Sequence, residues 1–262
     1  MVTFQDTNKF YSRNSAGKFL MDVSEIRTAF LGAGSIGDRV RYFCKSRIAL
    51  LRNGEGPFAF AGPYLVVHIV PLTAIDGSGQ INPREAKQLN IIPIDGQSTV
   101  QRFNLDGYLS ACTGNRPAAG YVQFFREGSI EAARPFHVAP KTDDDDIEFK
   151  GCFFARSEIY VLKAIKDYLA DLGRLSVSPP IVVQLSLVGL KGYCLEDPNQ
   201  YGGTWQTRSF DRDEILLPSA WIENSEQSLM EHLRPIFEAF WQAAGYEMDP
   251  VFDSASRQAG LE

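Results

Sequence analysis

The chain has 262 residues, of which 44% are hydrophobic and 12% aromatic, so it can bury one sizeable core or two modest ones. With 22% charged residues and a formal net charge of −6, its composition is that of a globular protein and excludes an intrinsically disordered one. The acidic balance also argues against a protein that coats nucleic acid with its whole surface, although it allows a local basic patch.

The spacing of the cysteines and the length of the apolar runs indicate where in the cell the protein is located. Four cysteines are scattered singly with no CxxC pair, which is typical of a reduced, intracellular protein: Cys44, Cys112, Cys152 and Cys194. The N-terminus is polar and lacks the apolar region of a signal peptide. The longest apolar run, residues 64–75, is too short to span a bilayer. We therefore expect a cytoplasmic protein with no membrane partner.

The first predicted elements are two short strands. Residues 9–13 (KFYSR) and 18–21 (KFLM) flank a turn sequence, NSAG, and Asp22 with Glu25 then forms a capping box that opens a helix. A hairpin has only one apolar face and needs a sheet to join, yet no strand is predicted upstream of it. The hairpin is thus expected to be the end of a larger parent domain, and its open edge predicts a homo-oligomer.

Further along, helical and sheet-forming runs follow one another without strict βαβ alternation. Helices are predicted at 22–31, 36–52, 155–172 and from Asn224 onward, with a short one starting at Pro83; strands are predicted at 64–72, 100–104, 121–126, 129–136 and 181–190. This order favours an α+β fold, with a mixed or antiparallel sheet packed with helices. The break at 53–57 (NGEGP) predicts three parts: 1–53 with the hairpin and linking helices, an α+β domain at 54–255, and a tail at 256–262, vector-derived at its end.

A glycine-rich stretch, residues 32–37 (GAGSIG), matches the GxGxxG fingerprint of dinucleotide sites. That chemistry needs a preceding strand, so that bare backbone N–H groups meet a pyrophosphate at the next helix. Here a capping box and a helical pattern precede it, which favours a turn between two helices. A nucleotide-dependent enzyme remains the weaker alternative.

The helix that follows concentrates positive charge. The candidates for nucleic-acid binding are Arg39, Arg41, Lys45 and Arg52, with Arg47 beside them and only Asp38 opposing. Long cationic side chains on one helix face can follow a phosphate backbone, because each contact releases counterions. The alternatives are a solvated helix face or ion pairs with acids elsewhere in the fold.

Other residue patterns predict no catalytic site, cofactor or metal. No His or Cys has the spacing of a zinc site, and neither a GxSxG elbow nor a phosphate-binding loop occurs. His68, inside an apolar strand, is expected to be a satisfied core or edge residue. Residues 143–146 (DDDD) lack the spacers and glycine of a metal loop and are expected to be solvated. The aromatic residues Phe237, Phe240, Trp241 and Tyr246 are expected in the core or in an interface.

Several stretches together resemble one family: FYSRNSAGKFLMDVSEIRTAF, YLVVHIVPL, GYVQFFREGSIEA, SPPIVVQLSLVGLKGY and EHLRPIFEAFWQAAG. The first resembles the last strands of the Schlafen-type, AlbA-like domain of bacterial nucleic-acid-binding proteins, with the helix after it. The others resemble the region that follows this domain. The resemblance implies a non-catalytic C-terminal region for structure or interaction, with nucleic acid as a partner of the parent protein.

Overall fold

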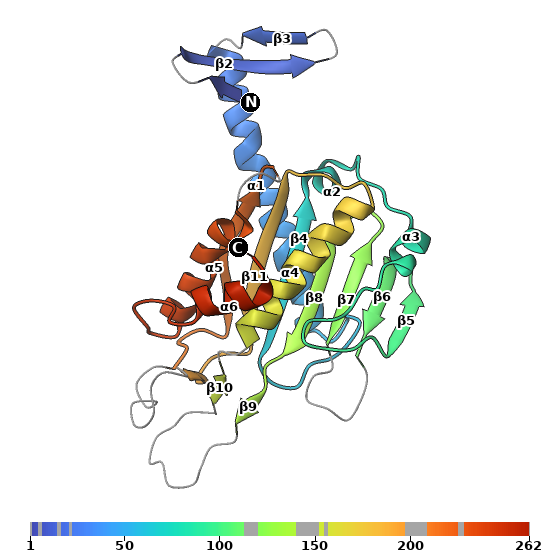
Figure 1. Ribbon diagram of the computed structural model, residues 1–262, viewed down its shortest axis with the longest axis vertical. Helices are drawn as coiled ribbons and strands as arrows, with labels where there is room; N and C mark the ends of the chain where they lie inside the picture. The colour runs from blue at the N-terminus through green and yellow to red at the C-terminus, as the bar shows by residue number, and fades with distance from the viewer. Residues whose placement is uncertain are drawn as a thin grey trace. The chain divides into compact units, whose positions relative to one another are not determined.

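The structure of the protein is a computed structural model (Figure 1). Its largest sheet has seven strands in the order β13-β11-β4-β8-β7-β6-β5. The structure describes residues 2–4, 7–14, 17–20, 23–112, 120–139, 152–154, 157–196, 209–224 and 228–261. Residue contacts divide the chain into two compact units, Met1–Lys45 and Ser46–Glu262.

In the first unit, the predicted hairpin is present and belongs to a three-stranded antiparallel sheet. Its strands are β1 (Val2–Phe4), β2 (Thr7–Asn14) and β3 (Gly17–Leu20), with β2 in the middle. The expectation that no strand precedes the hairpin was therefore wrong. A strand of three residues is too short to show the alternation from which a strand is predicted.

A single long helix, α1 (Val23–Arg52), replaces the two predicted helices and the turn between them. The glycines of residues 32–37 lie inside this helix, so the prediction of a glycine-rich turn between two helices was wrong. Each glycine weakens a helix by about 1 kcal/mol relative to alanine, which a long helix tolerates, and the stretch contains no proline to break it. A dinucleotide fingerprint would instead place these glycines between a strand and a helix.

The seven-stranded sheet lies in the second unit, and every neighbouring pair of its strands is antiparallel. Its strands are β4 (Tyr64–Pro71), β5 (Val100–Phe103), β6 (Gly107–Ala111), β7 (Tyr121–Phe125), β8 (Ile130–Pro135), β11 (Ile181–Val188) and β13 (Glu214–Ile222). The helices are α2 (Leu72–Asp76), α3 (Pro83–Gln88), α4 (Ser157–Arg174), α5 (Leu229–Ala243) and α6 (Phe252–Ala259). A small sheet contains β12 (Cys194–Glu196), β10 (Cys152–Phe154) and β9 (Val138–Ala139). The fold is α+β, as predicted.

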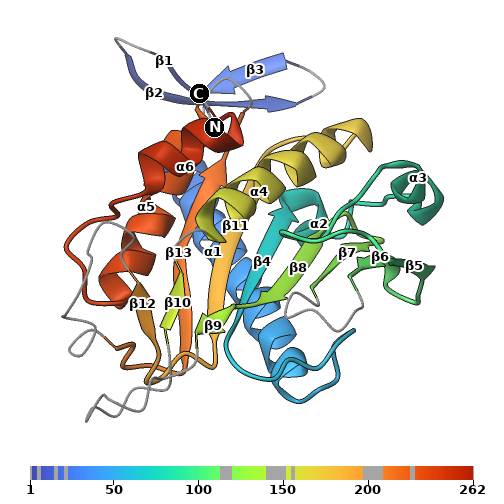
Figure 2. The same ribbon diagram turned by 60° about the horizontal axis from the view of Figure 1, so that its bottom comes forward.

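Alternate side chains of β4 show how the sheet is covered on both faces. Val67 and Ile69 point into the larger hydrophobic cluster, to which α4, α5 and α6 contribute. Tyr64 and Val66 point into a second cluster on the other face, together with Leu51 from the last turn of α1. Figure 2 shows α4 and this end of α1 on opposite faces of the sheet.

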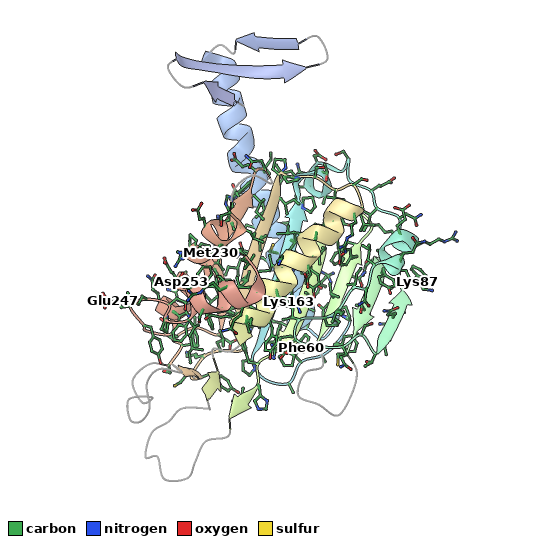
Figure 3. All side chains as sticks on the ribbon, in the orientation of Figure 1. Phe60, Lys87, Lys163, Met230, Glu247 and Asp253 are labelled. Carbon is green, nitrogen blue, oxygen red and sulfur yellow. The ribbon has the colours of Figure 1, made fainter. Side chains whose placement is uncertain are left out.

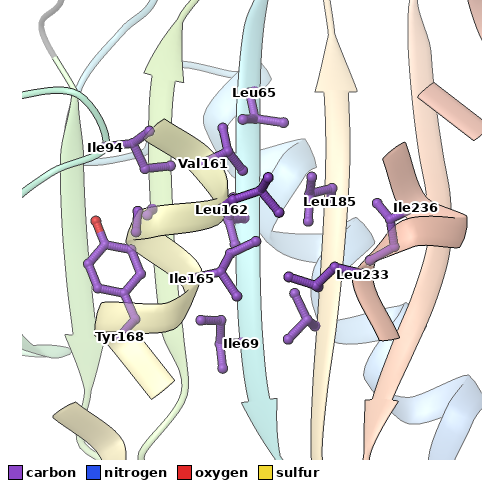
Figure 4. Packing of buried hydrophobic residues seen from close by; sticks show 14 of the residues in the cluster. Leu65, Ile69, Ile94, Val161, Leu162, Ile165, Tyr168, Leu185, Leu233 and Ile236 are labelled. Atoms are coloured by element: carbon purple, nitrogen blue, oxygen red, sulfur yellow. The ribbon is translucent and has the colours of Figure 1, made fainter. Parts of the chain in front are cut away.

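The predicted central helix and strand are confirmed. Leu162 and Ile165 of α4 are fully buried and face β4 near Leu65 and Ile69 (Figure 4). All eight residues of β11 are buried, including Val183. The helical repeat of apolar residues in α4 thus predicted the packed face correctly.

Two strands of the sheet were not predicted, and each has a feature that disguises it. β6 begins at Gly107, where a Cβ atom would lie 2.1 Å from the carbonyl oxygen of Phe124, so only glycine fits this close approach. β13 contains Pro218 and pairs through an irregular register with β11. Proline is tolerated there because β13 is the last strand of the sheet and one side of its backbone needs no partner.

The C-terminal boundaries also differ from the prediction. The last long helix, α5, starts at Leu229 after Ser228, and not at Asn224. Pro235 lies inside α5 without dividing it. Part of the expected tail at 256–262 belongs to α6, and Leu261 is buried. The amphipathic repeat of α6 is only two turns long, which made it hard to distinguish from a polar tail.

Candidate functional site

The exposed side of α1 carries a short row of cationic and aromatic side chains. Arg41 and Lys45 are one helical turn apart and both exposed, and Tyr42 between them is 75% exposed. Asp38 Oδ1 lies 3.8 Å from Arg41 Nη1, and both side chains are solvated, so this ion pair is weak. The opposite side of α1 is buried at Val40. Arg41, Tyr42 and Lys45 are called the basic row below.

The other two predicted cations do not join this row. Arg39 is exposed and lies one turn before Tyr42, but its spacing of two residues from Arg41 places it away from Arg41 around the helix. Arg52 forms two ion pairs, with Asp213 Oδ2 at 3.1 Å and with Glu214 Oε2 at 2.9 Å. This is the alternative of pairing with acids elsewhere in the fold. The structure therefore brings together two of the four predicted cations.

Arg47, the arginine that lies beside the four predicted cations, enters a buried polar network centred on Glu131 of β8. Its Nε and Nη2 donate to the two carboxylate oxygens of Glu131, both at 2.8 Å. Tyr121 donates its hydroxyl to Oε1 at 2.7 Å, and Nε2 of His68 lies 3.0 Å from Oε2. His68 and Glu131 are fully buried, so the predicted core location of the histidine is confirmed.

The electrostatics of this network follow from its partners. Burial by itself would raise the pKa of Glu131, but the hydrogen bonds and charges of Arg47 and His68 outweigh burial and lower the pKa to about 2. Burial, and then the adjacent carboxylate, raise the pKa of Tyr121 well above its ordinary value. Glu131 is thus an anion at neutral pH, and Tyr121 a neutral donor. Both carboxylate oxygens of Glu131 already have hydrogen-bond partners inside the protein. We therefore assign Glu131 a role in stabilising the fold.

A second buried carboxyl group, Glu158 near the start of α4, has different partners. Trp241 Nε1 donates to its Oε1 at 2.5 Å, and its other side meets Asp249. Burial, and then the charge of Asp249, raise the pKa of Glu158 well above its ordinary value. Asp249 Oδ1 accepts the N–H groups of Val251 and Phe252 at 2.8 and 2.9 Å. Burial and the neighbouring carboxylate therefore favour the neutral acid at Glu158, and burial raises the pKa of Asp249 as well.

Glu158 Oε2 and Asp249 Oδ2 are both buried and have no hydrogen-bond partner among the described residues. Trp241 belongs to the predicted aromatic group, whose members Phe237 and Phe240 are also buried in the core. The core location of that group is confirmed.

The part of the chain that the structure describes offers little for a cofactor or metal. An open hollow of about 380 Å³ is lined mainly by apolar and aromatic residues: Phe60, Pro63, Pro135, Phe136, Val138 and Tyr193 among them. Among the described residues, no group of three or more His, Cys, Asp or Glu side chains could hold a metal ion. The four aspartates at 143–146 lie outside the described residues.

Sequence reasoning missed three residues that matter here. Tyr42 stands between two predicted phosphate ligands, and that position was the available signal. Glu131 is an acid inside a predicted strand, and an isolated acid among buried residues indicates a charged partner. Glu158 is the second residue of α4, a common position for an exposed acid, so nothing in the sequence distinguished it.

The described helices include none that combines the length and apolarity needed to cross a membrane. Comparisons with protein-family models, with curated proteins and with solved structures found no match to this chain.

Proposed function

We propose that the chain is a non-catalytic interaction region of a nucleic-acid-binding protein of the Schlafen/AlbA-like type, and that the basic row on α1 contacts single-stranded nucleic acid. The observation that carries this proposal is the grouping of two exposed cations, one turn apart, with a largely exposed aromatic ring. Arg41 and Lys45 would neutralise phosphates, and Tyr42 would stack on a base, which requires bases that are not already paired.

The use of charge elsewhere in the chain supports an interaction role. Glu131 accepts hydrogen bonds from several partners inside the second unit, and Glu158 accepts one from Trp241. These strongly perturbed groups stabilise the fold, and perturbed groups of this kind would otherwise be the first candidates for catalysis. Within the described part of the chain, by contrast, the basic row has no such internal partner beyond the weak contact of Arg41 with Asp38.

Fluorescence anisotropy with a labelled single-stranded oligonucleotide, and with a duplex of the same length, tests the proposal. Replacing both Arg41 and Lys45 by Ala should reduce the salt dependence of binding by roughly one phosphate contact per residue. Tyr42→Ala should weaken single-strand binding by about 1–3 kcal/mol and leave duplex binding nearly unchanged. Arg84→Ala, an exposed arginine on α3, is the matched control and should change neither.

Two results would contradict the proposal. One is the absence of binding to either nucleic acid at low salt. The other is binding that the double variant and the Arg84 control weaken equally, because this would indicate diffuse attraction with no defined row.

Self-association is a second proposal, which the outer strands of the N-terminal sheet support. Among the described strands, β1 and β3 each pair only with β2, and an outer strand of this kind can pair with another chain. Light scattering of the full chain, beside a variant that lacks residues 1–21, tests this. A dimer of the full chain that dissociates when residues 1–21 are deleted would support self-association. A full chain with the monomer mass of 29.2 kDa would contradict it.

A further inference from the structure

The seven-stranded sheet ends at β5, and no other strand of the described part of the chain pairs with this edge. All four residues of β5 are exposed, including Val100 at 38% and Phe103 at 48%. Leu105, just beyond the strand, is 90% exposed, and Ile92 is 41% exposed. Half of the eight large hydrophobic residues that are exposed in the described part of the chain thus lie between positions 92 and 105.

The opposite edge of the same sheet is protected. β13 contains Pro218, its register with β11 is irregular, and α5 packs against it. Its first residue, Glu214, is held by Arg52. Proline, irregular pairing and charge are the usual devices that prevent strand addition. β5, with the sequence VQRF, contains no proline, and its register with β6 is regular throughout.

The backbone of β5 specifies the shape of a ligand. Asn104 N donates to Gly107 O at 3.1 Å, and the register continues without a shift to Val100 opposite Ala111. Because inward and outward groups alternate along an antiparallel strand, the N–H and C=O groups of Gln101 and Phe103 point away from the sheet. Such groups match the edge of one more extended strand.

The side chains specify the chemistry of that strand. Phe103 lies on the α3 face of the sheet, with its ring centroid 5.6 Å from that of Tyr108 and 5.7 Å from Lys87 Nζ. Figure 3 labels Lys87 on α3, at this end of the molecule. Arg102 lies on the opposite face and is the only charged residue between positions 98 and 105. The edge is therefore apolar and cationic.

We propose that β5 binds an extended, acidic and apolar peptide segment of a partner protein, which adds to the sheet as an eighth strand. An acidic side chain of the peptide faces Arg102, and apolar side chains pack on Phe103. A second copy of this chain fits less well, because a four-residue strand buries little of the roughly 1,200–2,000 Å² that a stable interface needs. Pairing two copies of this edge would also supply no acid for Arg102.

The test uses the full chain and a short fluorescein-labelled peptide in which valine and glutamate alternate. Gln101→Pro removes an outward N–H group and places the proline ring in the path of the added strand, while the inward bonds to β6 remain. We expect the peptide to bind the native chain and to bind Gln101→Pro at least about tenfold more weakly. Gln101→Ala is the matched control, since it loses the same side chain and keeps the N–H group.

Charge is tested separately. Arg102→Glu should weaken binding of the glutamate peptide and strengthen binding of a peptide in which lysine replaces glutamate. The thermal unfolding midpoint of each variant should match that of the native chain. A loss of binding can then not be attributed to a loss of folding.

Three results would overturn the proposal. The first is no binding of the glutamate peptide by the native chain, and the second is equal binding by the Pro and Ala variants. The third is a dimer of the native chain that Gln101→Pro dissociates, because the edge would then be occupied by a second copy.

Discussion

Glu131 and Glu158 are two buried glutamates in one fold, and they differ in charge. Glu131 faces a guanidinium, an imidazole and a phenol, and burial is outweighed, so its pKa falls to about 2. Glu158 faces an indole N–H and another carboxyl group, and burial dominates, so its pKa rises. Burial is nearly the same for both. The charge of the partners therefore decides which form is buried.

This contrast has a consequence for how each glutamate stabilises the fold. Glu131 stabilises it only as an anion, because protonation would leave the buried charge of Arg47 without its counter-charge. Glu158 stabilises it only as a neutral acid, because a second negative charge beside Asp249 would be buried without compensation. The same substitution, Glu to Gln, should thus have opposite results at the two positions.

The largest effect is expected for Glu131→Gln. It removes the counter-charge of Arg47 inside the protein, and breaking such a buried pair costs about 3–5 kcal/mol of unfolding free energy. Equilibrium unfolding in urea at pH 7 measures this. A loss below about 1 kcal/mol would show that the Glu131 network is solvated. The contrast between an ionised Glu131 and a neutral Glu158 would then be wrong.

The next effect is a loss of stability in acid. The folded pKa of Glu131, about 2, is lower than its ordinary value of 4.5, so the unfolded chain binds the proton more readily. The stabilisation is complete above pH 4.5 and is lost as the pH falls toward 2, a loss on the order of 3 kcal/mol. The free-energy gap between the native chain and Glu131→Gln should narrow over this range. A constant gap would contradict the assignment of Glu131 as the titrating group.

Glu158 should show the opposite pH dependence. Its folded pKa is raised, so its stabilisation is complete below its unfolded pKa and is lost as the pH rises through the folded value. Glu158→Gln keeps an acceptor for Trp241 and a donor for Asp249, and should change stability by less than about 1 kcal/mol at pH 5. At pH 9 the variant should be the more stable protein. A native chain that stays more stable at pH 9 would show that Glu158 is not protonated.

The smallest effect is expected for Arg52→Ala, the exposed counterpart of Arg47 on the same helix. Its ion pairs with Asp213 and Glu214 are solvated, so the loss should stay below about 1 kcal/mol and shrink further in high salt. Urea unfolding at two salt concentrations measures it. A loss of unfolding free energy as large as that of Glu131→Gln would mean that burial does not explain the difference in stabilisation between Arg47 and Arg52.

The sequence by itself determined the α+β class, helix α4 and strand β11, because their apolar residues repeat with a helical period or run without interruption. These patterns arise from burying one stripe or two faces, and they need no knowledge of the neighbours. It also identified the cations on α1 and the core position of His68.

Only the tertiary structure decided what those charges do. Arg47 and Glu131 are 84 residues apart in sequence, and no local pattern reports that they meet. The same holds for Glu158 and Trp241, 83 residues apart, and for Arg52 with Glu214. Propensity and period act over a few residues, whereas the pKa of a buried group depends on whatever the fold places within a few ångströms. The sequence therefore predicted the fold class and its clearest elements, and the fold decided which buried glutamate has a lowered pKa and which a raised one.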